Sequence, residues 1–259
     1  MRKLLLALLV VLCSFNAAAE TPEEKGLAIA QEADRRDTGW GDLQAQMSML
    51  LRNRHGEESL RQMRVKSLEV DDDGDKSLIV FDEPRDVKGT ALLTFSHKVK
   101  DDDQWLYLPA LKRVKRIASR NKSGPFMGSE FAFEDLASQE VEKYTYRFIE
   151  DGEFDGKPVF VMERYPVSKY SGYTRQVVQV DKERYIPLKI EFYDRKNALL
   201  KTLIFKGYKQ YLEQFWRADE MFMENHQTGK STLLTWKDYK FRTGLKDSDF
   251  TRNSLKRIR

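Results

Sequence analysis

The residues with the most evident binding chemistry lie in one stretch of the chain, residues 104–136. Its first half gathers cations, at Lys112, Arg113, Lys115, Arg116, Arg120 and Lys122. Its second half follows a Gly-Pro break and gathers apolar side chains, at Phe126, Met127, Phe131 and Phe133. Clustered cations attract nucleic acid, anionic lipid headgroups or acidic proteins, and sulfur-containing and aromatic side chains adapt to irregular apolar ligands. The stretch therefore indicates binding of a charged or hydrophobic partner.

Each half has two interpretations. The cations either form the polar face of a strand whose apolar residues, Leu111, Val114 and Ile117, turn inward, or they contact anionic headgroups or an acidic partner. The aromatic residues either form a mobile lip, which Gly124 and Gly128 favour, or pack across a sheet as core. The sequence leaves both questions open.

Catalytic patterns are missing from the sequence. His55, His97 and His226 are scattered singly, and the chain has no nucleophile elbow, zinc-protease motif, phosphate-binding loop or dinucleotide fingerprint. An envelope hydrolase would need His97 or His226 beside a carboxylate and a nucleophile. The acidic residues 71–75 lack the closing glutamate of a calcium loop, and we interpret them as a solvated turn. We predict a protein that is not an enzyme and that uses no metal and no cofactor.

The first nineteen residues have the pattern of a secretory signal peptide. Arg2 and Lys3 precede an apolar run at residues 4–12, and residues 17–19 are three alanines. Nine apolar residues are too few to span a bilayer as a helix. Cys13 follows a leucine, where a lipoprotein signal normally has a small residue. We therefore predict export to the periplasm with cleavage near Ala19.

The exported chain would be close to neutral. Without Arg2 and Lys3 the formal net charge falls from +4 to +2, and export also separates the protein from nucleic acid, so we exclude a nucleic-acid partner. Cys13 is the single cysteine, so the exported chain has no disulfide. No linker divides residues 20–259, which we predict to form a single domain.

The apolar pattern predicts a mainly β protein. Residues 22–37 have the capping signals of a helix, and Leu43, Met47 and Met49 belong to an alternation with period two that is typical of a strand. Residues 105–108 and 113–117 predict a hairpin, and residues 134–142 a short helix. Turn signals recur between the strands up to residue 241. A long antiparallel sheet of this kind normally curls to bury its apolar face.

Four segments resemble the LolA-like outer-membrane lipoprotein-sorting family, in particular its periplasmic branch often encoded beside RND/MMPL-type exporters. They are ADRRDTGW (residues 33–40), DVKGTALLTF (86–95), WLYLPALKRVKRI (105–117) and FMGSEFAFEDL (126–136). The resemblance implies a strongly curved, incomplete antiparallel β-barrel, with helices covering its concave apolar face. We expect about ten or eleven strands. Family members of this shape hold acyl chains in the cavity and carry lipid-modified cargo without chemistry.

The prediction for function is a periplasmic carrier or chaperone for a lipid or lipid-modified molecule, moving between inner and outer membranes with an RND/MMPL-type transporter as partner and touching membranes transiently. The predicted lipid contacts are Leu43, Met47, Met49, Val65, Trp105, Tyr107, Phe126, Met127, Phe131 and Phe133. The predicted headgroup or partner contacts are Lys112, Arg113, Lys115, Arg116 and Arg120. The alternative is an adaptor subunit of an exporter, with a filled core and no ligand.

Overall fold

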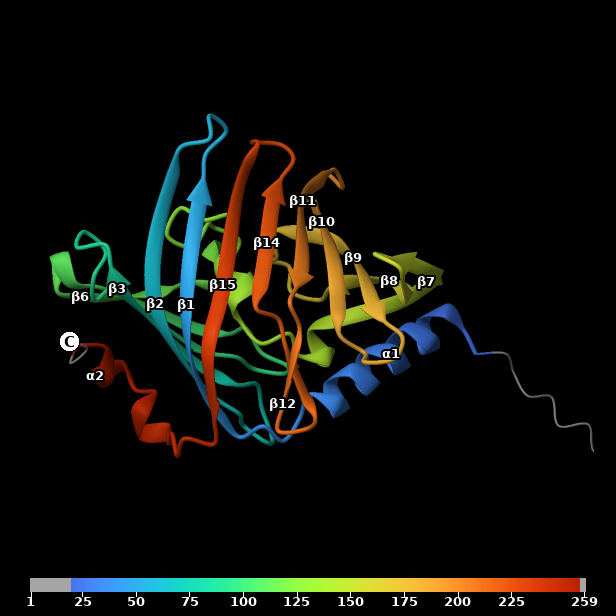
Figure 1. Ribbon diagram of the computed structural model, residues 1–259, viewed down its shortest axis with the longest axis horizontal. Coiled ribbons are helices and arrows are strands. Elements are labelled where there is room, and N and C mark those ends of the chain that lie inside the picture. The colour runs from blue at the N-terminus through green and yellow to red at the C-terminus, as the bar shows by residue number, and fades with distance from the viewer. Residues whose placement is uncertain (1–19, 257–259) are drawn as a thin grey trace, which may run out of the picture.

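The computed structural model describes residues 20–256, so the predicted signal peptide and its cleavage site lie outside the described part (Figure 1). The described chain starts with helix α1 (Pro22–Arg36) and continues through fifteen strands. The helix has the predicted start, because Thr21 Oγ1 accepts a hydrogen bond from Glu24 N (3.2 Å) and the Glu24 carboxylate accepts one from Thr21 N (2.8 Å). Asp37 caps its other end.

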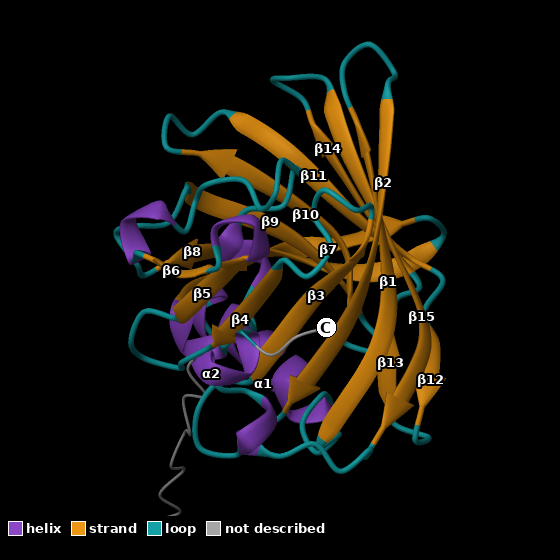
Figure 2. Ribbon diagram, turned by 90° about the vertical axis from the view of Figure 1, so that its left-hand side faces the viewer, coloured by secondary structure: helices purple, strands orange, loops and turns teal. Residues whose placement is uncertain are grey.

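Thirteen of the described strands form one antiparallel sheet in the order β6-β5-β4-β3-β2-β1-β15-β14-β11-β10-β9-β8-β7, with β6 and β7 at its two edges (Figure 2). The strands are β1 (Asp42–Arg52), β2 (Glu58–Leu68), β3 (Lys76–Glu83), β4 (Ala91–Phe95), β5 (Asp103–Leu108), β6 (Arg113–Ile117), β7 (Tyr144–Phe154), β8 (Lys157–Pro166), β9 (Tyr173–Asp181), β10 (Pro187–Asp194), β11 (Leu199–Lys206), β14 (Glu220–Asn225) and β15 (Lys230–Phe241). The short strands β12 (Lys209–Tyr211) and β13 (Phe215–Arg217) pair separately.

Period-two alternation sets which face of each strand is buried. In β1 the side chains of Leu43, Ala45, Met47 and Met49 are buried, while Gln46 between them is exposed, as the sequence predicts. The central strands β1 and β15 pair along most of their length, so residues from the two ends of the chain meet in the middle of the sheet.

A single core cluster lies on the concave side of the sheet. Each of the thirteen strands of the main sheet contributes at least one buried side chain to this cluster, from Ile117 in the edge strand β6 to Tyr146 in the edge strand β7. A flat sheet could not bring both edges to one core, so the sheet curves around the cluster (Figure 2). The sheet does not close, which agrees with the expectation of an incomplete barrel.

Both faces of strands β3 and β4 are buried. Ile79 and Phe81 face the concave core, whereas Leu78 and Val80 pack in a second cluster on the opposite face. The C-terminal segment covers that opposite face, since Phe250 belongs to the second cluster and is 1% exposed. This segment contains the turn η5 (Asp247–Asp249) and the short helix α2 (Arg252–Leu255).

Helix α1 lies directly on the backbone of β7. A Cβ atom at Gly26 would stand 2.8 Å from Phe148 N and 2.9 Å from Arg147 N, so only glycine permits this approach. Ile29, on the same helix, is buried in the concave core.

Three expectations about the fold need correction. The described part has fifteen strands rather than ten or eleven: thirteen form the main sheet, and two more form the β12–β13 ribbon where the chain leaves that sheet at Gly207 (φ +65°). The predicted helix at residues 134–142 consists of two 3-10 turns, η3 (Phe133–Leu136) and η4 (Val141–Lys143). The side chain of Asp135 accepts a hydrogen bond from Ala132 N (2.7 Å), which holds a tight turn where a helix was expected.

Helix α1 covers only part of the concave face, where Ile29 is buried, rather than the helices together covering it as the resemblance implied. The segment between β6 and β7, residues 118–143, occupies much of this place, and its helical parts are 3-10 turns of three or four residues. We call residues 118–143 the crossing segment.

Candidate functional site

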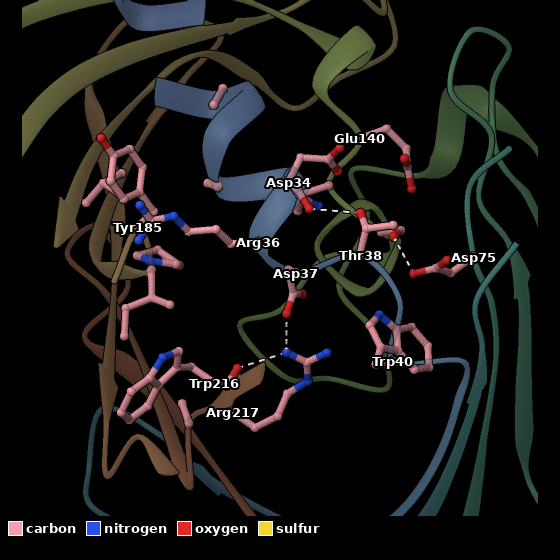
Figure 3. Close-up of a pocket in the computed structure, with 18 of the residues that line it drawn as sticks. Asp34, Arg36, Asp37, Thr38, Trp40, Asp75, Glu140, Tyr185, Trp216 and Arg217 are labelled. Carbon is pink, nitrogen blue, oxygen red and sulfur yellow. Dashed lines mark hydrogen bonds and ion pairs between the residues drawn. The ribbon is translucent and has the colours of Figure 1, made fainter. Parts of the chain in front are cut away.

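A cavity of about 1,140 Å³ opens between α1 and the concave face of the sheet (Figure 3). Its apolar lining comes from α1 and from strands across the sheet, with Ile29, Ala30, Ala33, Leu43, Val65, Met162, Val178, Val180, Ile190, Phe192, Leu203, Phe205 and Met221. Ligand pockets for small molecules usually measure about 300–1,000 Å³, so this space suits a bulky apolar ligand.

Ion pairs and aromatic side chains border one end of the cavity. Figure 3 shows the end of α1 meeting the β12–β13 ribbon there, where the Arg217 guanidinium contacts the Asp37 carboxylate (2.5 Å). The Arg36 guanidinium lies over the Tyr185 ring, 4.2 Å from its centroid, and donates to Glu183 O (2.7 Å). These contacts tie the helix to the sheet around the opening.

A second group of carboxylates lines the cavity beside the crossing segment. Burial, followed by the nearby Glu140 carboxylate, raises the pKa of Asp75 to about 7. The Asp75 carboxylate accepts hydrogen bonds from Val70 N (3.3 Å) and Ser138 Oγ (3.2 Å), and the second of these links the residue just before strand β3 to the crossing segment. Burial also raises the pKa of Glu140.

The raised pKa of Asp75 predicts a pH-dependent stability. Because the folded state holds the proton more tightly than an ordinary aspartate with pKa 3.8, this group stabilises the fold at low pH, and the contribution is lost as the pH rises to about 7. We expect Asp75→Asn to gain on the order of 1–3 kcal/mol of unfolding free energy relative to the wild type between about pH 4 and about pH 8. Denaturant titrations at both pH values measure this, and parallel pH profiles for the two proteins would contradict it.

The crossing segment is anchored to the sheet by a buried ion pair. Lys201 Nζ on β11 contacts the Asp135 carboxylate (2.7 Å), and the two side chains are 4% and 7% exposed. Lys201 Nζ also donates to Glu130 O (2.8 Å), and the Tyr173 hydroxyl donates to Asp135 (2.8 Å). Burial and the Asp135 charge raise the pKa of Tyr173. Glu134 accepts from Ser171 Oγ and Gly172 N, each at 2.8 Å.

The ten predicted lipid contacts fall into three places. Leu43 and Val65 line the cavity. Met47, Met49, Phe126, Phe131 and Phe133 are buried in the concave core, and Met127 packs partly buried against it. Trp105 and Tyr107 belong to the cluster on the opposite face, under the C-terminal segment. Of the two interpretations of the aromatic residues, the structure has the packed one, since Phe126 is 0% exposed and its ring lies 5.7 Å from that of Phe81.

The five predicted headgroup or partner contacts are exposed. Lys112, Arg113, Lys115, Arg116 and Arg120 lie on or next to β6, the edge of the sheet, while Ile117 turns into the core. Arg116 contacts the Asp103 carboxylate (2.6 Å). The sequence located this cationic edge correctly, and its binding role stays a prediction.

Most of the residues that line the cavity were not predicted from the sequence. Met162, Val178, Val180 and Ile190 come from strands β8 to β10, in the second half of the chain. A sequence signal was present at residues 188–192, where Leu, Ile and Phe alternate with Lys and Glu, but residues 176–180 (QVVQV) lack a regular alternation. The aromatic residues Phe126, Phe131 and Phe133, which are more conspicuous in the sequence, pack in the core instead.

The acidic turn and the histidines have structural partners. His97 Nδ1 contacts Asp73 (2.5 Å), and His97 is 8% exposed. The Asp73 side chain also accepts from Lys98 N (2.9 Å), so Asp73 and Asp75 have partners in the protein, while Asp71 and Asp72 are exposed as the sequence suggested. No helix in the described part of the chain is long and apolar enough to cross a membrane.

Comparison with known proteins identifies a family model and several crystal structures that are similar to this chain. A family model with the description "Uncharacterized protein" matches residues 73–257. No curated protein sequence matches the chain. The crystal structure of an outer-membrane lipoprotein-sorting protein domain from Vibrio parahaemolyticus is similar, with 63% identity, coverage of 90% of this chain and 99% of that chain, and a TM-score of 0.89.

Two further crystal structures extend this similarity. A DUF1329 family protein from Desulfovibrio piger has 31% identity, covers 91% of this chain and 99% of its own, and has a TM-score of 0.86. A LolA superfamily protein from Nitrosomonas europaea has 22% identity, covers 88% and 98%, and has a TM-score of 0.71, which relates the fold alone.

Proposed function

This chain belongs to the LolA-like family of outer-membrane lipoprotein-sorting proteins, and on this premise we propose that it is a periplasmic carrier that shelters the acyl chains of a lipid or lipid-modified molecule. The observation that supports the proposal most is the cavity of about 1,140 Å³ beneath α1, with its apolar lining from both halves of the sheet.

Transfer of acyl chains needs no catalytic group. Each CH₂ removed from water contributes roughly 0.8 kcal/mol, so an apolar cavity in a water-soluble domain is sufficient to hold such a chain between membranes. The polar side chains at the opening, including Asp37 and Arg217, already pair with each other rather than forming a nucleophile and base. In this proposal the protein acts by binding alone.

The alternative of an adaptor with a filled core agrees with part of the molecule. Phe126 and Phe131 are buried in the concave core, as that alternative requires. The cavity instead lies between α1 and the sheet, with lining from Leu43 and Val65 as well as from strands β8 to β11. We favour the carrier because a filled adaptor gives no reason for an apolar space of this size.

We also propose a transporter partner for the carrier. An inner-membrane RND/MMPL-type transporter is the donor or acceptor that we propose, and the exposed cations from Lys112 to Arg120 are the proposed contact with it or with anionic headgroups. Their exposure and their place at the sheet edge support such a contact.

The test is to look for bound acyl species and then to block the cavity. Native mass spectrometry of protein purified from the periplasm should detect a lipid-derived ligand. The Ala33→Trp variant should lose about tenfold or more in affinity for an acyl probe, because the large ring would occupy part of the cavity. Ala33 lines the cavity, whereas Ala28 is exposed on the other face of α1, so Ala28→Trp is the matched control.

Two results would overturn the carrier. One is the absence of any acyl ligand or acyl-probe binding in the wild-type protein. The other is equal probe affinity in the Ala33→Trp and Ala28→Trp variants, which would place the binding surface outside this cavity.

A further inference from the structure

Cations interrupt the apolar rows on the concave face of the sheet, and two of them lie on strands that line the cavity. Lys201 precedes Leu203 and Phe205 on the inward side of β11, and Arg164 follows Phe160 and Met162 on the inward side of β8. A charge in such surroundings is costly unless a counter-ion accompanies it. Lys201 has one, because it contacts Asp135 at 2.7 Å.

Arg164 differs from the other arginines of the cavity. Five arginines line it, and four of them contact carboxylates: Arg35 and Arg36 with Glu32, Arg184 with Asp181, and Arg217 with Asp37. Among residues 20–256, no carboxylate forms an ion pair with Arg164. Its charge is therefore the one arginine charge in the lining that lacks an anionic partner within the described protein.

The protein nevertheless holds the Arg164 guanidinium in place. Its Nε donates to Gln176 Oε1 (2.7 Å), and Gln176 is 2% exposed. The Tyr144 ring lies 4.5 Å from the guanidinium carbon. The terminal nitrogens donate no hydrogen bond to another described residue, so the donors that suit a planar oxyanion remain available.

Two acids of the crossing segment are already engaged. On the crossing segment, Asp135 accepts from Lys201 and Tyr173, and Glu134 accepts from Ser171 and Gly172. A side-chain shift that paired Arg164 with either of these acids would break those buried contacts, which makes them unfavourable counter-ions for Arg164.

We propose that Arg164 is the anion-binding group of the cavity and pairs with an oxyanion, carboxylate or phosphate, that is attached to the acyl chain of the cargo. Apolar chains then lie along the row of Met162, Val178 and Val180 while the anionic end reaches Arg164. This inference rests on the carrier proposal and adds the charge class of the ligand: an anionic amphiphile rather than a neutral or cationic one.

The test compares short-chain amphiphiles below their micelle concentration. Dodecanoate, dodecyl phosphate and uncharged dodecanol share one chain and differ in the head. We expect Arg164→Leu to weaken binding of the two anionic probes by about tenfold or more and to leave dodecanol within about twofold. Arg164→Lys should recover part of the loss. The exposed Arg147 on β7 provides the control, since Arg147→Leu makes the same change in net charge outside the cavity.

The outcomes separate the two proposals. If dodecanol binds and Arg164→Leu keeps wild-type affinity for both anionic probes, the anion site is wrong and the carrier stands. If none of the three probes binds to the wild type, the carrier itself fails. If Arg164→Leu loses affinity for dodecyl phosphate alone, the cargo has a phospholipid-like headgroup. If it loses affinity for dodecanoate alone, the cargo has a free carboxylate.

Discussion

Lys201→Met is expected to lower the free energy of unfolding by about 3–5 kcal/mol, because it leaves the buried Asp135 carboxylate without its cation. Lys201 and Asp135 are 4% and 7% exposed at their side chains, so water cannot replace the lost partner. The crossing segment also loses the bond from Lys201 Nζ to Glu130 O. Chemical denaturation at neutral pH measures the change.

Two comparisons isolate the cause. Lys209 contacts Asp219 at 2.6 Å but is 65% exposed, so Lys209→Met should cost at most about 1 kcal/mol. Adding Asp135→Leu to Lys201→Met removes the stranded charge and should restore part of the stability. If Lys201→Met cost no more than Lys209→Met, the crossing segment would not depend on this anchor.

Phe126→Ala is expected to cost about 3–5 kcal/mol of unfolding free energy, the usual range for deleting a buried aromatic side chain. Phe126 is 0% exposed, and its ring lies 5.7 Å from the rings of both Phe81 and Phe133. The loss therefore opens a void in the middle of the concave core rather than at a surface. Denaturant or thermal unfolding of the purified variant checks it.

Leu111→Ala is the matched control for this change. Leu111 is 62% exposed on the turn that joins β5 to β6, and its truncation should alter the unfolding free energy by less than about 0.5 kcal/mol. If Phe126→Ala instead kept full stability and lost affinity for an acyl probe, the mobile lip suggested by Gly124 and Gly128 would be the correct interpretation.

Local patterns in the sequence determined much of the fold. Thr21 and Glu24 are three residues apart, which is the spacing of a capping box, so the start of α1 could be read directly. Alternation between polar and apolar residues placed Met47 and Met49 on the inward face of β1. The turn between residues 105 and 117 indicated the β5–β6 hairpin and the cationic sheet edge. Each of these features depends on neighbours close in the chain.

The tertiary structure alone decided which apolar face is filled and which is hollow. Trp105 and Leu106 are adjacent in sequence, yet one packs beneath the C-terminal segment and the other in the concave core. Phe126 fills the core, while Ala33 and Val178, less conspicuous in sequence, border the cavity. The reason is physical: burial and the pairing of charges, such as Lys201 with Asp135, depend on segments far apart in the chain. Periodicity along one segment carries no information on what that segment meets.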